Sequence, residues 1–195
     1  MGEKSLQEKN YTVEEYLELL KNSEEKLEYE NGRVFAMAGG LRSHSRIISN
    51  TFGTLLTALP KGCTVNTSDL GIYIDDHERY TFPDLSVSCD TEELERNMFL
   101  KNPKLIVEVS SKSTEKYDNT TKMLKYFSLP SLLEYMLVQA DRPIVVLYSR
   151  NEKGVFEVFG TIGINFEVYL PNFKLHLPMQ EIYDRVTGLQ ETDLL

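Results

Sequence analysis

The sequence has only two cysteines among its 195 residues and no hydrophobic run that approaches the length of a membrane span. A transmembrane helix needs about 20 consecutive apolar residues, and the charged opening of the chain lacks the apolar stretch of a signal peptide. Cys63 and Cys89 have no Cys or His neighbour at the spacing of a zinc site. We therefore expect a cytoplasmic protein without a membrane partner, in which both cysteines are reduced core thiols.

Positive charge is scarce as well. Lys and Arg number 21 against 30 Asp and Glu, which gives a formal net charge of −9. The overall field repels nucleic acid, so any contact with phosphates requires a local reversal of sign. The segment 101–125 provides one, because it holds six lysines and three acids. Phosphate binding would need such a segment, although a solvated lysine face has the same composition.

Repeats, low-complexity tracts and Pro-, Gly- or Ser-rich linkers are also missing, so nothing divides the chain. A chain of 195 residues buries one sizeable core rather than two. We expect a loose segment over 1–10, a single domain over 11–186 and a tail over 187–195. Helical and strand patterns are mixed along the domain, which predicts the α/β class with a mixed β-sheet flanked by helices.

Local signals place the elements of this domain. Thr12 and Glu15 form a capping-box pair ahead of a helix, Asn31-Gly32 is a hairpin signal, and Ser43 is a candidate N-cap. Further helices are expected to end near 59, to span 114–127 and to span 179–186. Strands are expected at 27–30, 33–37, 70–74, 83–88, 105–109, 135–140, 144–148, 155–159 and 166–170.

Two carboxylates interrupt otherwise apolar strands. Glu108 lies in the run Leu105–Val109, whose other residues are all apolar, and a buried carboxylate there costs several kcal/mol unless it is paired. Asp84 follows Pro83 and opens a strand of alternating apolar residues. A solvated sheet edge or a lysine partner would explain Glu108, and a strand end would explain Asp84. Side by side, the two oxygen ligands would suit Mg²⁺ or Mn²⁺.

These residues belong to a longer pattern. Phe82-Pro83-Asp84, then Asn102-Pro103 and Leu105–Ser111, resemble the PD-(D/E)XK nuclease superfamily and, more narrowly, the Uma-two family of restriction-endonuclease-like proteins. The match covers about 11–186, and the extended series is specific although the short motif is common. It continues through Ser113-Thr114, Tyr117-Asp118, Lys122, Tyr126, Glu134-Tyr135 and, upstream, Glu28, Gly32 and His44.

The resemblance implies a restriction-endonuclease-like core and assigns roles to four residues. Asp84 and Glu108 match the metal-binding carboxylates, with Mg²⁺ or Mn²⁺ as cofactor. The superfamily pattern has a lysine two positions after the Glu, where this chain has Ser110, and the Uma-two pattern instead has a helical lysine that matches Lys122. Glu28 matches a glutamate that could serve as a further metal or water ligand.

Simpler explanations remain for several of these residues. Glu28 could be an outward residue of the hairpin, and Asp118, Lys122 and Tyr126, four apart on one helical stripe, could be a surface ion pair beside a half-buried tyrosine. His44 and Asp69 are weaker candidates.

The function expected from these residues is metal-dependent hydrolysis of DNA phosphodiester bonds, with a homodimer as a further expected partner. A nuclease fold that only binds nucleic acid or protein is one alternative, and Ser110 in the lysine position favours it. Hydrolysis of a small phosphate ester is the other. The chain has no Gly-rich phosphate loop, Ser-His-Asp order or zinc ligand set that would support a different hydrolase.

Overall fold

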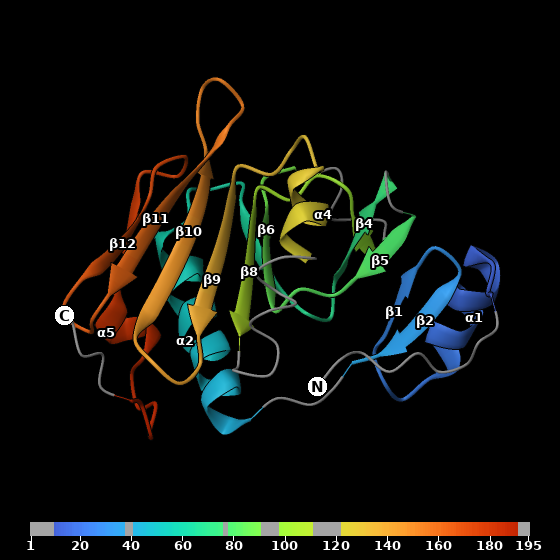
Figure 1. Ribbon diagram of the computed structural model, residues 1–195, viewed down its shortest axis with the longest axis horizontal. Helices are drawn as coiled ribbons and strands as arrows, with labels where there is room; N and C mark the ends of the chain where they lie inside the picture. Colours follow the sequence, from blue (N-terminus) through green and yellow to red (C-terminus); the bar gives the residue numbers. More distant parts are fainter. Residues whose placement is uncertain (1–9, 38–40, 76–77, 91–97, 111–121, 191–195) are drawn as a thin grey trace.

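A six-stranded sheet, a five-stranded sheet and a separate two-stranded hairpin carry the fold, with helices on both faces of the larger sheet (Figure 1). This computed structural model describes residues 10–37, 41–75, 78–90, 98–110 and 122–190. The predicted α/β class with mixed sheets flanked by helices is confirmed, with more than one sheet where the sequence pattern predicts one.

The six-stranded sheet forms the centre of the molecule. Its only parallel pair joins the two central strands, β8 and β9, and every other neighbouring pair is antiparallel. In spatial order the strands are β11 (Phe156–Ile162), β10 (Ile144–Arg150), β9 (Glu134–Gln139), β8 (Leu105–Ser110), β6 (Leu85–Ser88) and β3 (Thr64–Thr67).

The five-stranded sheet lies beside the larger one and ends in the N-terminal hairpin. Asn31 and Gly32 take positive φ angles of 45° and 84° at the predicted turn, as a two-residue hairpin requires. In spatial order the strands are β2 (Arg33–Ala36), β1 (Leu27–Glu30), β5 (Arg79–Thr81), β4 (Gly71–Ile74) and β7 (Phe99–Leu100).

The helices begin and end only in part where the sequence signals predict. The capping box of Thr12 and Glu15 is formed at the start of α1 (Val13–Asn22), as predicted. The prediction of Ser43 as a cap is wrong, because α2 (Arg42–Ala58) starts after Leu41, without a side-chain cap. The last helix, α5 (Met179–Ile182), is shorter than predicted. Of the helix predicted over 114–127, residues 114–121 lie outside the described chain and α4 (Met123–Phe127) is its described end.

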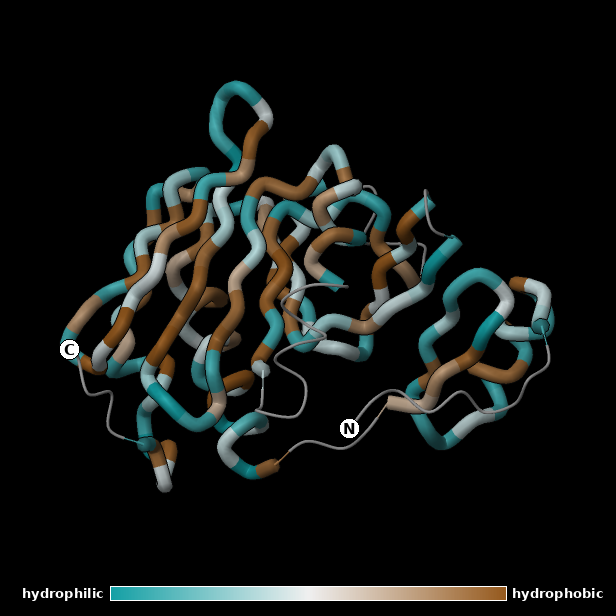
Figure 2. The backbone as a smooth tube through the Cα atoms, viewed as in Figure 1, coloured by the Kyte–Doolittle hydropathy of each residue, from teal (hydrophilic) through white to brown (hydrophobic). Residues whose placement is uncertain are grey.

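Apolar side chains form three packed clusters. Figure 2 shows that hydrophobic residues, in brown, recur along the strands of the larger sheet. The largest lies between one face of the six-stranded sheet and α2, α5 and the hairpin of β12 (Glu167–Leu170) and β13 (Leu175–Pro178). The second lies on the opposite face, under α4 and β4. The third joins α1 to the N-terminal hairpin. The two sheets therefore meet on the α4 face of the larger sheet.

Four strands were not predicted: β3, β5, β7 and β13. They are two to four residues long, which is too short for an alternating pattern to stand out. Pairing with neighbouring strands stabilises them, and the residues of a short strand do not reveal which segment it will pair with.

The prediction of two reduced thiols is wrong, because Cys63 and Cys89 form a disulfide with an S–S distance of 2.03 Å. The antiparallel register of β3 and β6 pairs Thr64 with Ser88. The next residues outward are the two cysteines, so the sheet brings them face to face. Their sequence separation of 26 contains no sign of this pairing.

None of the helices in the described part of the chain is both long and apolar enough to cross a membrane.

Candidate active site

Glu108 is a buried acid in the middle of the central sheet. Every residue of β8 is buried, and the side chain of Glu108 is on the α4 face, together with Ile106. Leu105, Val107 and Val109 alternate to the α2 face and complete the larger core. A carboxylate in this position needs strong partners, because its desolvation costs several kcal/mol.

Lys122 and Tyr126 supply those partners from the helical stripe. The Lys122 ammonium donates to Glu108 Oε1 at 3.4 Å, and the Tyr126 hydroxyl donates to the same oxygen at 3.0 Å. Burial, and then the negative charge of Glu108, raise the pKa of Tyr126 well above its ordinary value. The phenol therefore stays protonated and acts as a permanent donor.

Glu28, in β1, is the second buried acid of the cluster. Its Oε1 accepts from the Thr81 hydroxyl at 2.5 Å and from the Phe82 backbone N–H at 3.0 Å, and its Oε2 accepts from Arg79 at 3.3 Å. The Lys122 ammonium lies 3.9 Å from Oε1. The outward orientation considered for Glu28 is therefore wrong, since only 2% of this residue is exposed.

Glu30 and Lys125 extend the buried charges toward the surface. Arg79 contacts Glu30 Oε2 at 2.8 Å as well as Glu28, and Lys125 pairs with Glu30 Oε1. The contacts run from Lys125 through Glu30, Arg79, Glu28 and Lys122 to Glu108, so acids and bases alternate and balance. This alternation explains how so many charges are tolerated between two sheets.

Asp84 lies opposite Glu108. Strands β6 and β8 pair Leu85 with Val107, and continuing this register by one residue places Asp84 across from Glu108. Asp84 Oδ2 accepts from the Val109 N–H at 2.7 Å, and His44 Nε2 lies 3.2 Å from the same oxygen. Within the described chain both of these contacts use Oδ2, which leaves Oδ1 for a further ligand.

The donor set suits a hard divalent cation that keeps most of its water. Asp84 and Glu108 offer carboxylate oxygens on adjacent strands, and Mg²⁺ is commonly held by one or two carboxylates plus phosphate and water. No cluster of three or more His, Cys, Asp or Glu side chains with metal-binding geometry occurs among the described residues. In the described part of the site, Asp84 and Glu108 are the carboxylates that could hold such an ion.

Asp69, one of the weaker candidates, has a different partner. Asp69 contacts Lys26 at 2.8 Å on the surface, and this ion pair lowers the pKa of its carboxyl. Asp118 lies outside the described chain, as does much of the lysine-rich segment 101–125. Arg79 and Thr81, which hold Glu28, were missed. They belong to a three-residue strand, and nothing local in the sequence marks them.

The family comparison covers most of the chain. Residues 13–173 match the model of the Uma2 family, whose description is "putative restriction endonuclease". An uncharacterized protein of Synechocystis sp. is 40% identical over 167 residues, which span 80% of this chain and 87% of that protein. A second uncharacterized protein of the same organism is 32% identical over 130 residues, or 65% of this chain and 73% of that one.

A solved structure has the same fold. The crystal structure of a protein from Anabaena variabilis, described as a "putative nuclease belonging to DUF820", matches with a TM-score of 0.71 at 21% identity. The match covers 88% of this chain and 97% of that one. The fold of this chain is therefore shared with an experimentally determined protein.

Proposed function

Since the chain belongs to the Uma2 family of restriction-endonuclease-like proteins, we propose that it hydrolyses DNA phosphodiester bonds with the help of Mg²⁺ or Mn²⁺. One observation carries the proposal: Lys122 Nζ is 3.4 Å from Glu108 Oε1, on the face where Asp84 lies opposite Glu108. This arrangement supports the proposal, because it would place a fixed ammonium beside two carboxylates that could hold a cation.

The divergent lysine position fits this proposal. Ser110 stands in β8 where the superfamily pattern has a lysine, and it is buried. The ammonium of Lys122 reaches Glu108 from the start of α4 instead. A lysine with this position can stabilise negative charge on a phosphate oxygen as the bond to the leaving group breaks.

Asp84 and Glu108 would hold the metal ion. When bound, such an ion supplies a more acidic water and neutralises charge on the phosphate. The chain's other residues have positioning roles: Tyr126 fixes Glu108 through its hydrogen bond, and Glu28 holds Lys122 close to Glu108. Glu28 is itself engaged by Arg79, Thr81 and Phe82, so we assign it to positioning rather than to metal binding.

Cleavage of supercoiled plasmid and of a labelled DNA duplex tests the proposal. Mg²⁺ or Mn²⁺ should support cleavage, EDTA should abolish it, and Asp84→Asn and Glu108→Gln should each reduce it by at least about 10². DNA binding without cleavage under every metal condition would favour the binding module. Turnover of a small aryl phosphate ester without turnover of DNA would favour the small-substrate hydrolase.

A further inference from the structure

A cavity of about 500 Å³ lies between the first turns of α2 and the segment that follows α5. Its lining combines guanidinium and hydroxyl groups with one apolar side chain, and no carboxylate is found among the described residues that line it. The lining residues are Arg42, Ser43, Ser45, Arg46, Ser49, Arg185, Val186 and Thr187. In a chain with a net charge of −9, this is a local reversal of sign.

Arg42 and Arg46 carry charge that the described protein does not neutralise. Both are exposed on α2, and neither has a carboxylate within ion-pair distance in the described part of the chain. They are four residues apart on a helix, where like charges repel. They also lie near its N-terminus, where the helix dipole disfavours cations and no acidic residue is present. Their charges therefore do not stabilise the free protein through these interactions.

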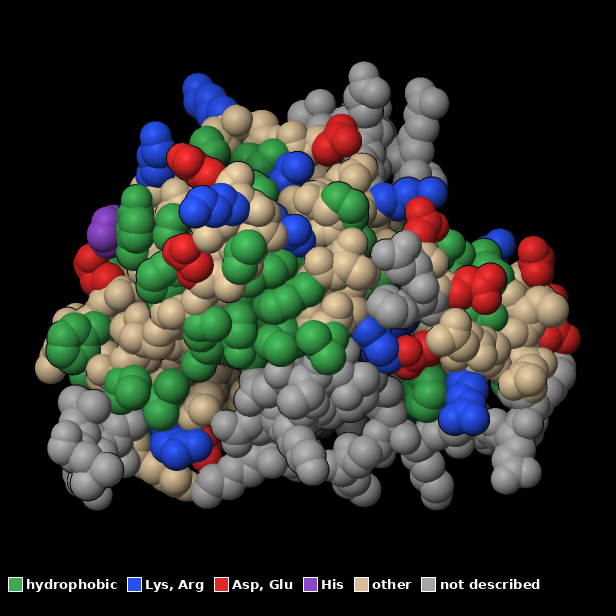
Figure 3. Space-filling model, turned by 45° about the horizontal axis from the view of Figure 1, so that its top comes forward, with side chains coloured by type: hydrophobic (Ala, Val, Ile, Leu, Met, Phe, Trp, Pro, Cys, Tyr) green, Lys and Arg blue, Asp and Glu red, His purple; other side chains and the backbone are tan. Residues whose placement is uncertain are grey.

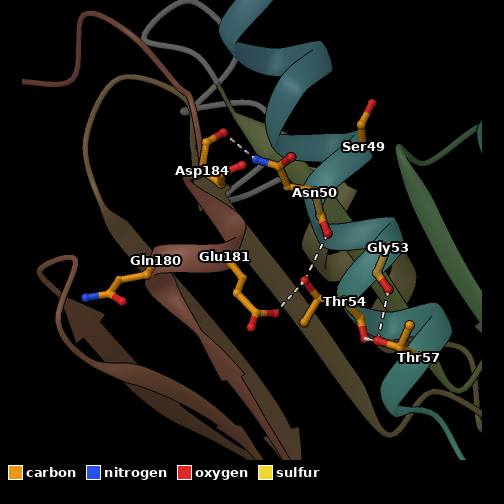
Figure 4. A pocket seen from close by; sticks show the side chains of 8 residues that line it. All are labelled: Ser49, Asn50, Gly53, Thr54, Thr57, Gln180, Glu181 and Asp184. Carbon is orange, nitrogen blue, oxygen red and sulfur yellow. Dashed lines mark hydrogen bonds between the residues drawn. The ribbon is translucent and has the colours of Figure 1, made fainter.

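Arg185, the third arginine of the lining, is positioned at the cavity by hydrogen bonds from Asn50 to the residues just before it. The side-chain amide of Asn50, in α2, donates to the backbone oxygens of Ile182 and Asp184 at 3.1 and 2.8 Å, in the adjoining cavity shown in Figure 4. These bonds fasten the segment after α5 against α2. Arg185 follows directly, with its side chain 81% exposed and Asp184 at 3.3 Å as a competing partner.

The cavity and the candidate active site use the same turn at the start of α2. His44 lies between Ser43 and Ser45, two residues that line the cavity, and its Nε2 is 3.2 Å from Asp84 Oδ2. A strand whose phosphates occupy the cavity therefore passes next to the residues proposed to hold the metal.

From this geometry we infer that the arginine cavity binds the phosphate backbone of the DNA substrate, beside the phosphate that is cleaved. Guanidinium groups bind phosphate oxygens in bidentate geometry, and hydroxyl groups add neutral donors. The inference rests on the proposed function, because it assigns a further part of the same substrate to the protein. It also assigns a use to two arginines that the fold itself does not need.

Binding measured in EDTA tests the inference independently of cleavage. The affinity of wild type, of Arg42→Ala/Arg46→Ala and of Arg33→Ala/Lys153→Ala for a fluorescent DNA duplex would be measured by anisotropy from 50 to 200 mM NaCl. The second double variant is the control, because it removes the same charge from exposed residues in β2 and in the β10–β11 turn. We expect the arginine variant alone to bind at least about tenfold more weakly, with a log–log salt slope smaller by about 2.

A second readout separates this role from a structural one. Without DNA, the arginine variant should unfold at a temperature equal to or above that of wild type, because repulsion and an unfavourable dipole contact are removed. Duplex DNA should raise the melting temperature of wild type more than that of the variant. Inorganic phosphate at the same phosphate concentration should raise it less than DNA.

Equal affinities and equal salt slopes for the two double variants would overturn the inference, even if wild type cleaves DNA. A full effect of inorganic phosphate would overturn it as well, because the cavity would then be a site for a small anion. Loss of binding in the arginine variant, with no cleavage by wild type in Mg²⁺ or Mn²⁺, would support the inference and contradict the proposed hydrolysis.

Discussion

Tyr126 donates a hydrogen bond to Glu108 Oε1 at 3.0 Å, although the two residues come from different elements and both are buried. The phenol also lies 3.4 Å from the Thr81 hydroxyl, which donates to Glu28. One tyrosine thus contacts β8 of the larger sheet and β5 of the smaller one. The arrangement of the candidate site depends on this link between the two sheets.

Tyr126→Phe should destabilise the protein by about 2 kcal/mol, because it removes a hydrogen bond from a buried carboxylate and leaves the oxygen without that donor. Urea unfolding measures the change. Tyr148→Phe is the matched control, since Tyr148 packs in the same aromatic cluster and no hydrogen bond of its hydroxyl is found among the described residues. A similar loss in both variants would contradict the role of the Tyr126 bond.

Lys122→Met should reduce turnover by about 10² or more, the effect of losing one fixed charge at a reacting phosphate. Lys125, three residues further along the helix, is the comparison variant. It is not an exposed lysine, because it pairs with Glu30 and only 15% of its side chain is exposed. Lys125→Met should therefore cost stability, as Lys122→Met should, without a comparable loss of turnover. Denaturant unfolding and cleavage rates are measured together, and equal losses of turnover would contradict a special role for Lys122.

Mg²⁺ or Mn²⁺ should raise the melting temperature of wild type, because a ligand that binds only the folded state stabilises it, by about 2.7 kcal/mol at 100 times its Kd. Asp84→Asn and Glu108→Gln should largely lose this gain. Glu134→Gln is the control, since Glu134 is an equally buried acid whose partners, Asn172 and Ser149, lie outside the site. A full metal-dependent shift in both site variants would show that the metal is elsewhere.

Without metal, Asp84→Asn and Glu108→Gln should differ in melting temperature. Glu108→Gln replaces a charge that two buried donors stabilise, so it should lower the melting temperature. Asp84→Asn removes a carboxylate that is more exposed, and its effect should be smaller. Differential scanning in EDTA checks this order.

Local sequence patterns were sufficient to predict those features that a single helix, turn or strand determines. The capping box, the Asn31-Gly32 hairpin and the buried run of β8 all form as their residues predict. The importance of Glu108 follows from the same logic, because a carboxylate within an apolar strand must have partners. The resemblance to nucleases then led to Lys122, which contacts Glu108 in the structure.

Long-range pairing could not be predicted in the same way. Arg79 and Thr81 contact Glu28 across about fifty residues of sequence, and their strand is stable only because β1 and β4 flank it. The disulfide has the same origin. In each case strand register, rather than local composition, determines which side chains meet.

A homodimer is expected to form through the α4 face of β10 and β11. Hydrophobic side chains gather on the face of the molecule seen in Figure 3, and β11 is an edge strand whose Val158 is 61% exposed. Two copies related by a twofold axis would cover this face and present two sites to a duplex. Val158→Asp should shift sedimentation at micromolar concentration from dimer to monomer.

Val155→Asp is the control for the interface, because Val155 has a similar exposure but precedes β11, in the turn that follows β10. It should leave the dimer intact. A wild-type protein that sediments only as a monomer, with or without DNA, would contradict the expectation.

Glu134 should make the stability of the protein depend on pH. The side chain lies under the hairpin of β12 and β13, where its Oε1 accepts from the Asn172 backbone N–H at 2.8 Å. Its Oε2 is buried and has no hydrogen-bond partner among the described residues. Burial raises the pKa of Glu134 from 4.5 to about 7, so the folded protein holds a proton that the unfolded chain releases.

The difference in bound protons between the folded and unfolded states determines how the stability changes with pH. Between about pH 4.5 and 7 the folded state binds more protons than the unfolded state, so the free energy of unfolding falls as pH rises. The contribution is fully present below pH 4.5 and is lost as pH rises through 7, a total of about 3 kcal/mol. Glu134→Gln removes the titration, so the difference between wild type and this variant isolates it from every other group. Urea unfolding at several values from pH 5 to 8 should show wild type losing stability relative to Glu134→Gln as pH rises, and a pH-independent difference would contradict the raised pKa.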